Sequence, residues 1–103
     1  MKFKLEVDEK LVAQDFLKFS AVVLKYNRHT RRYVYRLVKR FDASAQYVRL
    51  DPQELRTVEQ LLKAGLNALE NNLPKDQEAY QKFSSERRPR LESVLTKLGG
   101  KNV

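Results

Sequence analysis

The sequence predicts an α+β fold in which an antiparallel β-sheet, arranged as a meander, precedes a C-terminal helical hairpin. Apolar and charged residues alternate from Lys2 to Val7, as in a half-buried strand. Ten of the 23 residues from 19 to 41 are β-branched or aromatic, which favours strands. Beyond residue 51, two stretches repeat apolar residues at helical spacing. We therefore expect a single domain over residues 1–98, with mainly sheet in 1–50, two helices in 51–98 and a flexible tail at 99–103.

The first half of this assignment contains one ambiguous stretch, residues 19–42. Asp8 is a suitable N-cap for a short helix over residues 9–18. Residues 19–42 then fit both the two-residue period of a strand and the 3.6-residue period of a helix. The residues that share one face are Tyr33, Tyr35, Leu37 and Phe41 at strand spacing, and Tyr33, Val34, Leu37, Val38 and Phe41 at helical spacing. Composition favours strands, with a loop at 27–30, a turn at 42–44 and a further strand at 45–50. The alternative is a mostly α fold with residues 30–42 helical.

The two C-terminal helices have clearer signals. Asp51 is an N-cap, Pro52 takes the first helical position, and Glu54 is placed to bond back to the cap amide, as in a capping box. Apolar residues then recur at steps of three and four, which predicts a helix to about residue 72. Asp76 is a candidate cap for the second helix, in which Pro89 should cause a kink or a break near residue 85.

The positive charge of the chain is concentrated in one segment. The formal net charge is +8, and residues 18–50 hold nine basic residues and one acidic residue, whereas 1–17 and 51–103 have net charges of −1 and +1. Six of the ten aromatic residues lie in the same segment. Clustered cations interleaved with aromatic rings suit a partner with phosphates and flat bases. We therefore expect a non-catalytic protein that binds single-stranded DNA or RNA, in preference to a duplex, through a basic sheet face. The candidate contacts are the basic residues Lys25, Arg28, Arg31, Arg32, Arg36, Lys39, Arg40 and Arg49, and the aromatic residues Tyr26, Tyr33, Tyr35 and Tyr47.

One family resemblance points the same way. A hairpin, a strand that ends in Tyr47-Val48-Arg49-Leu50 and a capped helix from Asp51-Pro52-Gln53-Glu54 resemble the positive-cofactor-four, Pur and whirly group of single-strand binders. The basic pair Arg31-Arg32 before Tyr33-Val34-Tyr35 adds to this resemblance, which covers residues 19–72. It implies a curved antiparallel sheet ahead of a helix, and a homodimer. The extra C-terminal helix departs from the small members of the group.

Enzyme, metal and membrane functions have little support in the sequence. The chain has no cysteine and therefore no thiolate site, and His29 is its one histidine. Glu6 and Asp8 are a weak metal-binding pair, and Ser84-Ser85 lacks a base partner at a recognisable spacing. We therefore expect no catalysis, no metal and no cofactor. Apolar runs are far shorter than the ~18 residues of a membrane span. The charged N-terminus is unlike a secretory signal, so we expect an intracellular protein.

Two other kinds of partner are open at this point. The leucine-rich C-terminal helices would serve as a protein–protein interaction module if their apolar stripes were exposed, either by dimerising or by docking a partner helix. Attraction to anionic lipid would require residues 30–42 to form a basic amphipathic helix with an exposed apolar face.

Overall fold

The computed structural model describes residues 1–23, 27–72 and 76–99, and most of these residues are helical. The helices in chain order are α1 (Val7–Val23), α2 (Arg28–Arg40), α3 (Pro52–Asn72), α4 (Glu78–Lys82) and α5 (Arg88–Gly99), with a π-helical segment, η1 (Phe83–Arg87), between the last two. Strands β1 (Lys2–Phe3) and β2 (Val48–Arg49) pair antiparallel, with Lys2 opposite Arg49 and Phe3 opposite Val48.

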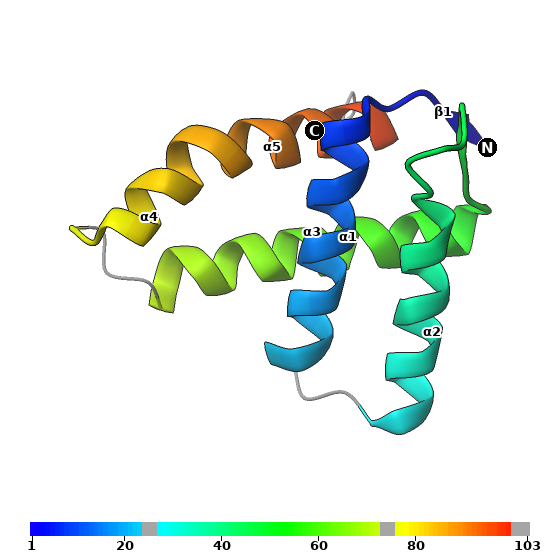
Figure 1. Ribbon diagram of the computed structural model, residues 1–103. Helices are drawn as coiled ribbons and strands as arrows, with labels where there is room; N and C mark the ends of the chain where they lie inside the picture. Colours follow the sequence, from blue (N-terminus) through cyan, green and yellow to red (C-terminus); the bar gives the residue numbers. More distant parts are fainter. Residues whose placement is uncertain (24–26, 73–75, 100–103) are drawn as a thin grey trace.

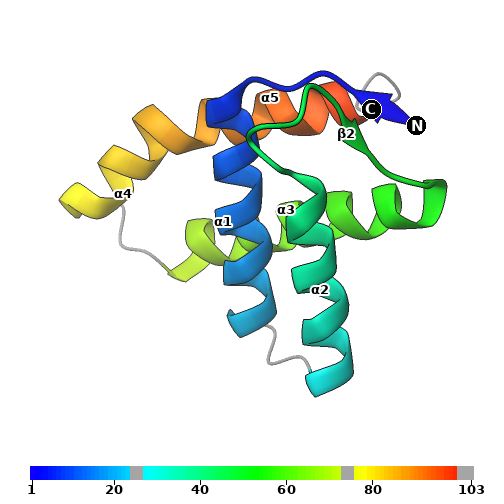
Figure 2. The ribbon, with the colours of Figure 1, turned by 45° about the vertical axis from the view of Figure 1, so that its right-hand side comes forward.

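Helix α1 is the centre of the arrangement, because it packs against α2, α3 and α5. Helix α2 runs back alongside α1, and the ends of both helices project beyond α3 (Figures 1 and 2). Helix α3 crosses α1 and pairs with the α4–η1–α5 segment, which runs along it in the opposite direction (Figure 1). As a result, the N-terminal half of α2 projects from the molecule, whereas its C-terminal end lies beside the start of α3.

The predicted sheet meander is wrong, and the mostly α alternative describes the fold. Residues 28–40 form a helix, and the only strands in the described part of the chain are two residues each. Helical spacing places Val34, Leu37 and Val38 on one side, where they are 1%, 0% and 8% exposed. Tyr35, which the strand interpretation placed beside Leu37, is 44% exposed. The β-branched composition misled because strand propensity is weaker than the gain from burying a complete helical stripe.

Helix α1 is longer than predicted at both ends. It begins before Glu9 and continues through residues 19–23, which the sequence assigned to a strand. The close approach of α1 to α3 explains this extension. Ser20 Oγ donates a 2.7 Å hydrogen bond to the Leu61 carbonyl, and a methyl group added at Gly65 would lie 2.8 Å from that Oγ. Gly65 therefore leaves room on α3 for the Ser20 hydroxyl and for the Phe16 ring, which an added methyl group would approach to 3.1 Å.

The start of α3 is confirmed in detail. Glu54 N–H donates to Asp51 Oδ1 at 2.8 Å and Asp51 N–H donates to Glu54 Oε1 at 3.0 Å, which is the reciprocal capping box. The break near residue 85 is also present, as η1. Pro89 has no N–H to donate to the carbonyl four residues earlier, and the Arg88 N–H bonds to the Phe83 carbonyl, five residues back.

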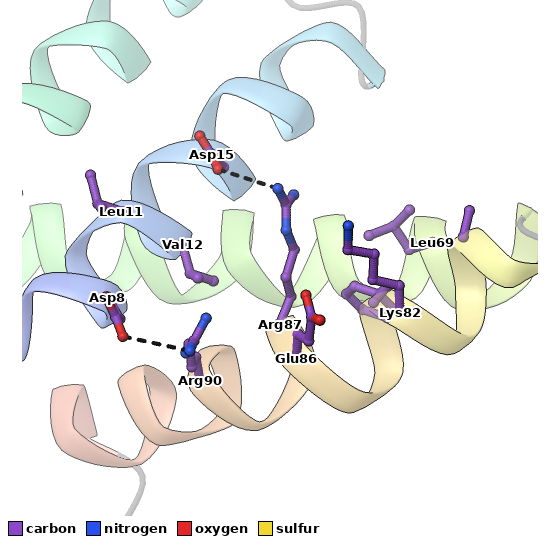
Figure 3. A pocket seen from close by; sticks show the side chains of 11 residues that line it. Asp8, Leu11, Val12, Asp15, Leu69, Lys82, Glu86, Arg87 and Arg90 are labelled. Atoms are coloured by element: carbon purple, nitrogen blue, oxygen red, sulfur yellow. Dashed lines mark ion pairs between the residues drawn. The ribbon is translucent and has the colours of Figure 1, made fainter.

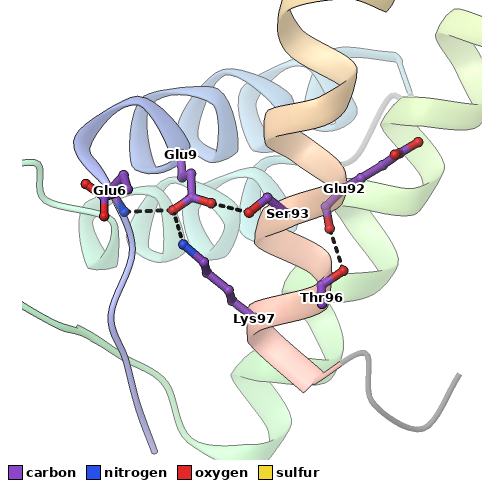
Figure 4. Close-up of polar contacts among 6 residues, drawn as sticks. All are labelled: Glu6, Glu9, Glu92, Ser93, Thr96 and Lys97. Atoms are coloured by element: carbon purple, nitrogen blue, oxygen red, sulfur yellow. Dashed lines mark hydrogen bonds and ion pairs between the residues drawn. The ribbon is translucent and has the colours of Figure 1, made fainter.

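A polar cluster joins α1 to α5 (Figure 4). Glu9 is 5% exposed and accepts hydrogen bonds from Lys97 Nζ at 2.7 Å, from the Glu6 N–H at 2.8 Å and from Ser93 Oγ. Burial alone would raise the pKa of Glu9, but these hydrogen bonds outweigh burial and hold the pKa below its ordinary 4.5. The carboxylate is therefore a structural link between the two helices.

Side chains of α1 also hold the segment that follows α2. The amide of Gln14 donates a 2.6 Å hydrogen bond to the Phe41 carbonyl, and the buried Lys10 donates to the Ala45 carbonyl. Phe41 itself is fully buried. These contacts seat the C-terminal end of α2 on α1, so the orientation of α2 is set by the core.

Candidate nucleic-acid interface

The structure brings most of the predicted basic contacts onto one helix. Six of them lie on α2 and are exposed: Arg28, Arg31, Arg32, Arg36, Lys39 and Arg40. Arg49 is exposed on β2, away from that helix. Lys25 and Tyr26 lie outside the described residues. The predicted basic segment is therefore a helical surface, and the predicted sheet face is not present in the described part of it.

The helical period keeps the predicted row of arginines but shortens its spacing. A strand would have placed Arg32, Arg36 and Arg40 in one row, about 13 Å apart. On α2, Arg28, Arg32 and Arg36 follow one another at successive turns, about 6 Å apart along the axis, and Arg40 takes the next turn.

Five of the six described cations of α2 have no acidic partner. Arg40 forms an ion pair with Glu54, at 3.4 Å between the nearest N and O. Among the described residues, no ion pair involves the remaining five, Arg28, Arg31, Arg32, Arg36 and Lys39, which we call the α2 basic face. In η1 and α5, by contrast, all four basic residues pair with a carboxylate: Arg87, Arg88, Arg90 and Lys97.

The α2 basic face works against the stability of its own helix. Arg28 and Arg32, and again Arg32 and Arg36, are like charges four residues apart, an arrangement that costs about 0.2–0.5 kcal/mol for each pair. The first turn of α2 contains Arg28 and no acidic residue, although the positive end of the helix dipole lies there. Folding alone does not account for such a charge distribution, whereas a polyanionic partner would relieve both costs.

Only part of the predicted aromatic set is exposed. Tyr33 is partly buried and packs against the hydrophobic core, whereas Tyr35 is exposed on α2. Tyr47 is 37% exposed and lies next to β2, where the Lys2 ammonium is 5.1 Å from its ring centroid. In the described residues, the α2 surface therefore carries one exposed aromatic ring among five unpaired cations.

Apart from the α2 basic face, the molecule has a groove between α1 and the α4–η1–α5 segment (Figure 3). It is an open groove of about 600 Å³ with apolar residues such as Leu11 and Phe83 in its wall. Two ion pairs cross it, Asp8 with Arg90 at 3.5 Å and Asp15 with Arg87 at 3.9 Å. Most of its charged groups are thus already paired within the chain, which distinguishes the groove from the α2 basic face.

The residues that the sequence analysis considered for metal binding or catalysis lie on the surface or form local contacts. Glu6 and Asp8 are exposed, and no group of three or more His, Asp or Glu residues that could hold a metal is found within the described ranges. His29 is exposed on the first turn of α2, and Ser85 Oγ donates to the Lys82 carbonyl at 3.3 Å. In the part of the chain that the structure describes, no helix combines the length and apolar character needed to cross a bilayer.

The leucine stripes of the two C-terminal helices face the interior. Leu61, Leu62, Leu91 and Leu98 are buried, and Leu55, Leu66, Leu69 and Leu95 are partly buried against the same core. The apolar side of α2 is buried as well. The described residues of α3 and α5 therefore present no exposed leucine stripe for docking, and those of α2 no exposed apolar face for lipid insertion.

Comparison of the chain with protein-family models, with curated proteins and with solved structures finds no match.

Proposed function

We propose that this chain binds nucleic acid through the α2 basic face, as a binding protein and not as an enzyme. The observation that carries the proposal is the group of five exposed cations without acidic partners on one helix, whereas all four basic side chains of η1 and α5 are paired. Phosphates along a nucleic-acid backbone supply a regular row of negative charge, and their neutralisation releases condensed counterions.

The position of α2 supports the same proposal. Its apolar side is held in the core by Val34, Leu37 and Val38, so the helix presents its basic side without any rearrangement. The N-terminal half of α2 projects beyond α3, where a long polymer can approach it (Figures 1 and 2). A binding surface that is preorganised in this way loses little conformational entropy when it meets its partner.

The proposal is tested by titrating labelled oligonucleotides with the protein at several salt concentrations. If all five cations contact phosphates, the logarithm of the affinity should fall with the logarithm of the salt concentration at a slope of about −3 to −5. The triple variant Arg28→Gln, Arg32→Gln, Arg36→Gln should weaken binding and reduce the steepness of that slope by about 2 to 3. Glutamine has nearly the helix propensity of arginine, so circular dichroism should be unchanged.

A matched control removes the same charge elsewhere. Arg56, Lys63 and Lys82 are exposed and lie outside α2, so the triple variant Arg56→Gln, Lys63→Gln, Lys82→Gln lowers the net charge by the same amount. We expect it to bind nearly as the unmodified chain does. Equal losses in the two triple variants would mean that net charge alone drives binding, and no loss in the α2 variant would contradict the proposal.

A further inference from the structure

We infer that the partner of the α2 basic face is a double helix of B-form DNA, with α2 lying in its major groove. This inference rests on the proposed function and adds to it the kind of nucleic acid. Two observations carry it: the distribution of the cations around α2, and the small number of aromatic rings on the same surface.

The cations are spread widely around the helix axis. Measured from Arg32 at about 100° per residue, Lys39 lies about 20°, Arg28 about 40° and Arg31 about 100° to one side, and Arg36 lies about 40° to the other. The α2 basic face thus covers about 140° of the circumference. A single strand follows one line over a protein surface and would meet the cations of one side. The two walls of a groove present phosphates on both sides of an inserted helix at once.

The dimensions of α2 fit a major groove. A helix with its side chains is about 10–12 Å across, and the major groove of B-form DNA is about 12 Å wide. Helix α2 has 13 residues and is therefore about 20 Å long, the rise of about six base pairs. Its projection beyond α3 leaves the outer side and the N-terminal end free to enter a groove (Figure 2). The major groove of duplex RNA is deep and narrow and does not admit the helix.

The aromatic residues argue against a single strand. Proteins that bind single strands stack successive bases on several aromatic side chains along a basic groove. On α2, Tyr35 is exposed, whereas Tyr33 packs against the core. One ring cannot form a series of stacking platforms. The sequence-based preference for single strands depended on a sheet that would have exposed several tyrosines, and helical folding removes that arrangement.

The test compares three labelled probes of one sequence: duplex DNA of about 16 base pairs, the corresponding single strand, and duplex RNA. The length is more than twice the six base pairs that α2 spans. We expect duplex DNA to bind at least about tenfold more tightly than either other probe at 0.1 M salt. Equal or tighter binding of the single strand or of duplex RNA overturns this inference and leaves the proposed function standing. Absence of binding to all three probes contradicts both.

Single variants on opposite sides of the α2 basic face provide a second test on the same duplex. Arg31→Gln and Arg36→Gln should each lower the affinity by about 5- to 10-fold at 0.1 M salt, because each removes one phosphate contact. A loss in only one of them would place the contacts on a single line and overturn insertion into a groove. Tyr35→Ala should change duplex affinity by less than about threefold, whereas loss of a stacked base would cost about 5- to 150-fold. A loss in that larger range would overturn the inference as well.

Discussion

Replacement of Arg32 by glutamine should stabilise the fold while it weakens nucleic-acid binding. Arg32 is exposed in the middle of the α2 basic face, four residues from Arg28 on one side and from Arg36 on the other. Each of these like-charge pairs costs about 0.2–0.5 kcal/mol, so their removal should raise the free energy of unfolding by about 0.4–1 kcal/mol. Arginine and glutamine have similar helix propensities, so little of the change would come from the backbone.

The assay is urea unfolding of the two proteins at low and at high salt. Because the Debye length falls from about 30 Å at 0.01 M salt to about 3 Å at 1 M, the gain from Arg32→Gln should shrink or vanish at high salt. Lys63→Gln is the matched control, since Lys63 is exposed on α3 and follows Glu59 by four residues, a favourable spacing. It removes one positive charge and should lower stability by about 0.2–0.5 kcal/mol at low salt.

A loss of stability in Arg32→Gln would refute this reasoning. Such a result would mean that Arg32 makes a stabilising contact within the folded chain, and the charges of α2 would then have a structural explanation. A gain of the same size in Lys63→Gln would show that the general reduction of net charge, and not the local repulsion on α2, is responsible.

Three further predictions test the fold. Leu37→Ala should lower the free energy of unfolding by about 2–5 kcal/mol because Leu37 is fully buried, whereas Tyr35→Ala should lower it by less than about 1 kcal/mol. Similar losses for the two variants in chemical denaturation would contradict the helical assignment of α2. Gly65→Ala should lower the free energy of unfolding by about 1 kcal/mol, because the added methyl group meets Ser20 Oγ, which is held by its hydrogen bond to the Leu61 carbonyl. This overpacking exceeds the gain in helix propensity. A raised melting temperature would contradict the close α1–α3 contact. The Glu9 carboxylate, whose folded pKa is lowered, should stabilise the fold above pH 4.5, and this contribution should be lost as the pH falls through the lower folded pKa. Glu9→Gln should therefore lose less stability between about pH 7 and pH 3 than the unmodified chain, and equal losses in urea unfolding would count against the cluster.

The C-terminal half was predictable from the sequence because its signals are local. The capping box needs only Asp51 and Glu54, and the effect of Pro89 follows from its missing N–H. The break is a π-helical segment. Pro89 predicted where the helix would be interrupted, but not that the interruption would be π-helical. Asp76 was expected to cap the second helix, but the residue at the cap is Gln77, and the element begins at Glu78.

Residues 19–42 were not predictable because two periodicities fit the same apolar residues. Whether this segment forms a helix or strands depends on which of its residues pack against α1, and the sequence of the segment alone does not contain that information. Tyr35 is exposed and Leu37 is buried, although a strand would place both on one face, and the neighbours Leu37 and Val38 are both buried, as on one side of a helix. The described basic residues of α2 are exposed, and their role in binding stays a prediction. The row of Arg32, Arg36 and Arg40 persists on the helix, since residues four apart share a face at either period, but its spacing is shorter than in a strand.

The most direct test of binding at the α2 basic face is a nuclear magnetic resonance titration of the labelled chain with the DNA duplex. The backbone and arginine side-chain signals of residues 28–40 should show the largest changes, and they should revert as salt is added. Signals from residues that line the groove between α1 and η1, such as Asp15 and Arg87, should change little. Changes confined to that groove, or none on α2 at concentrations where the duplex is bound, would contradict the account.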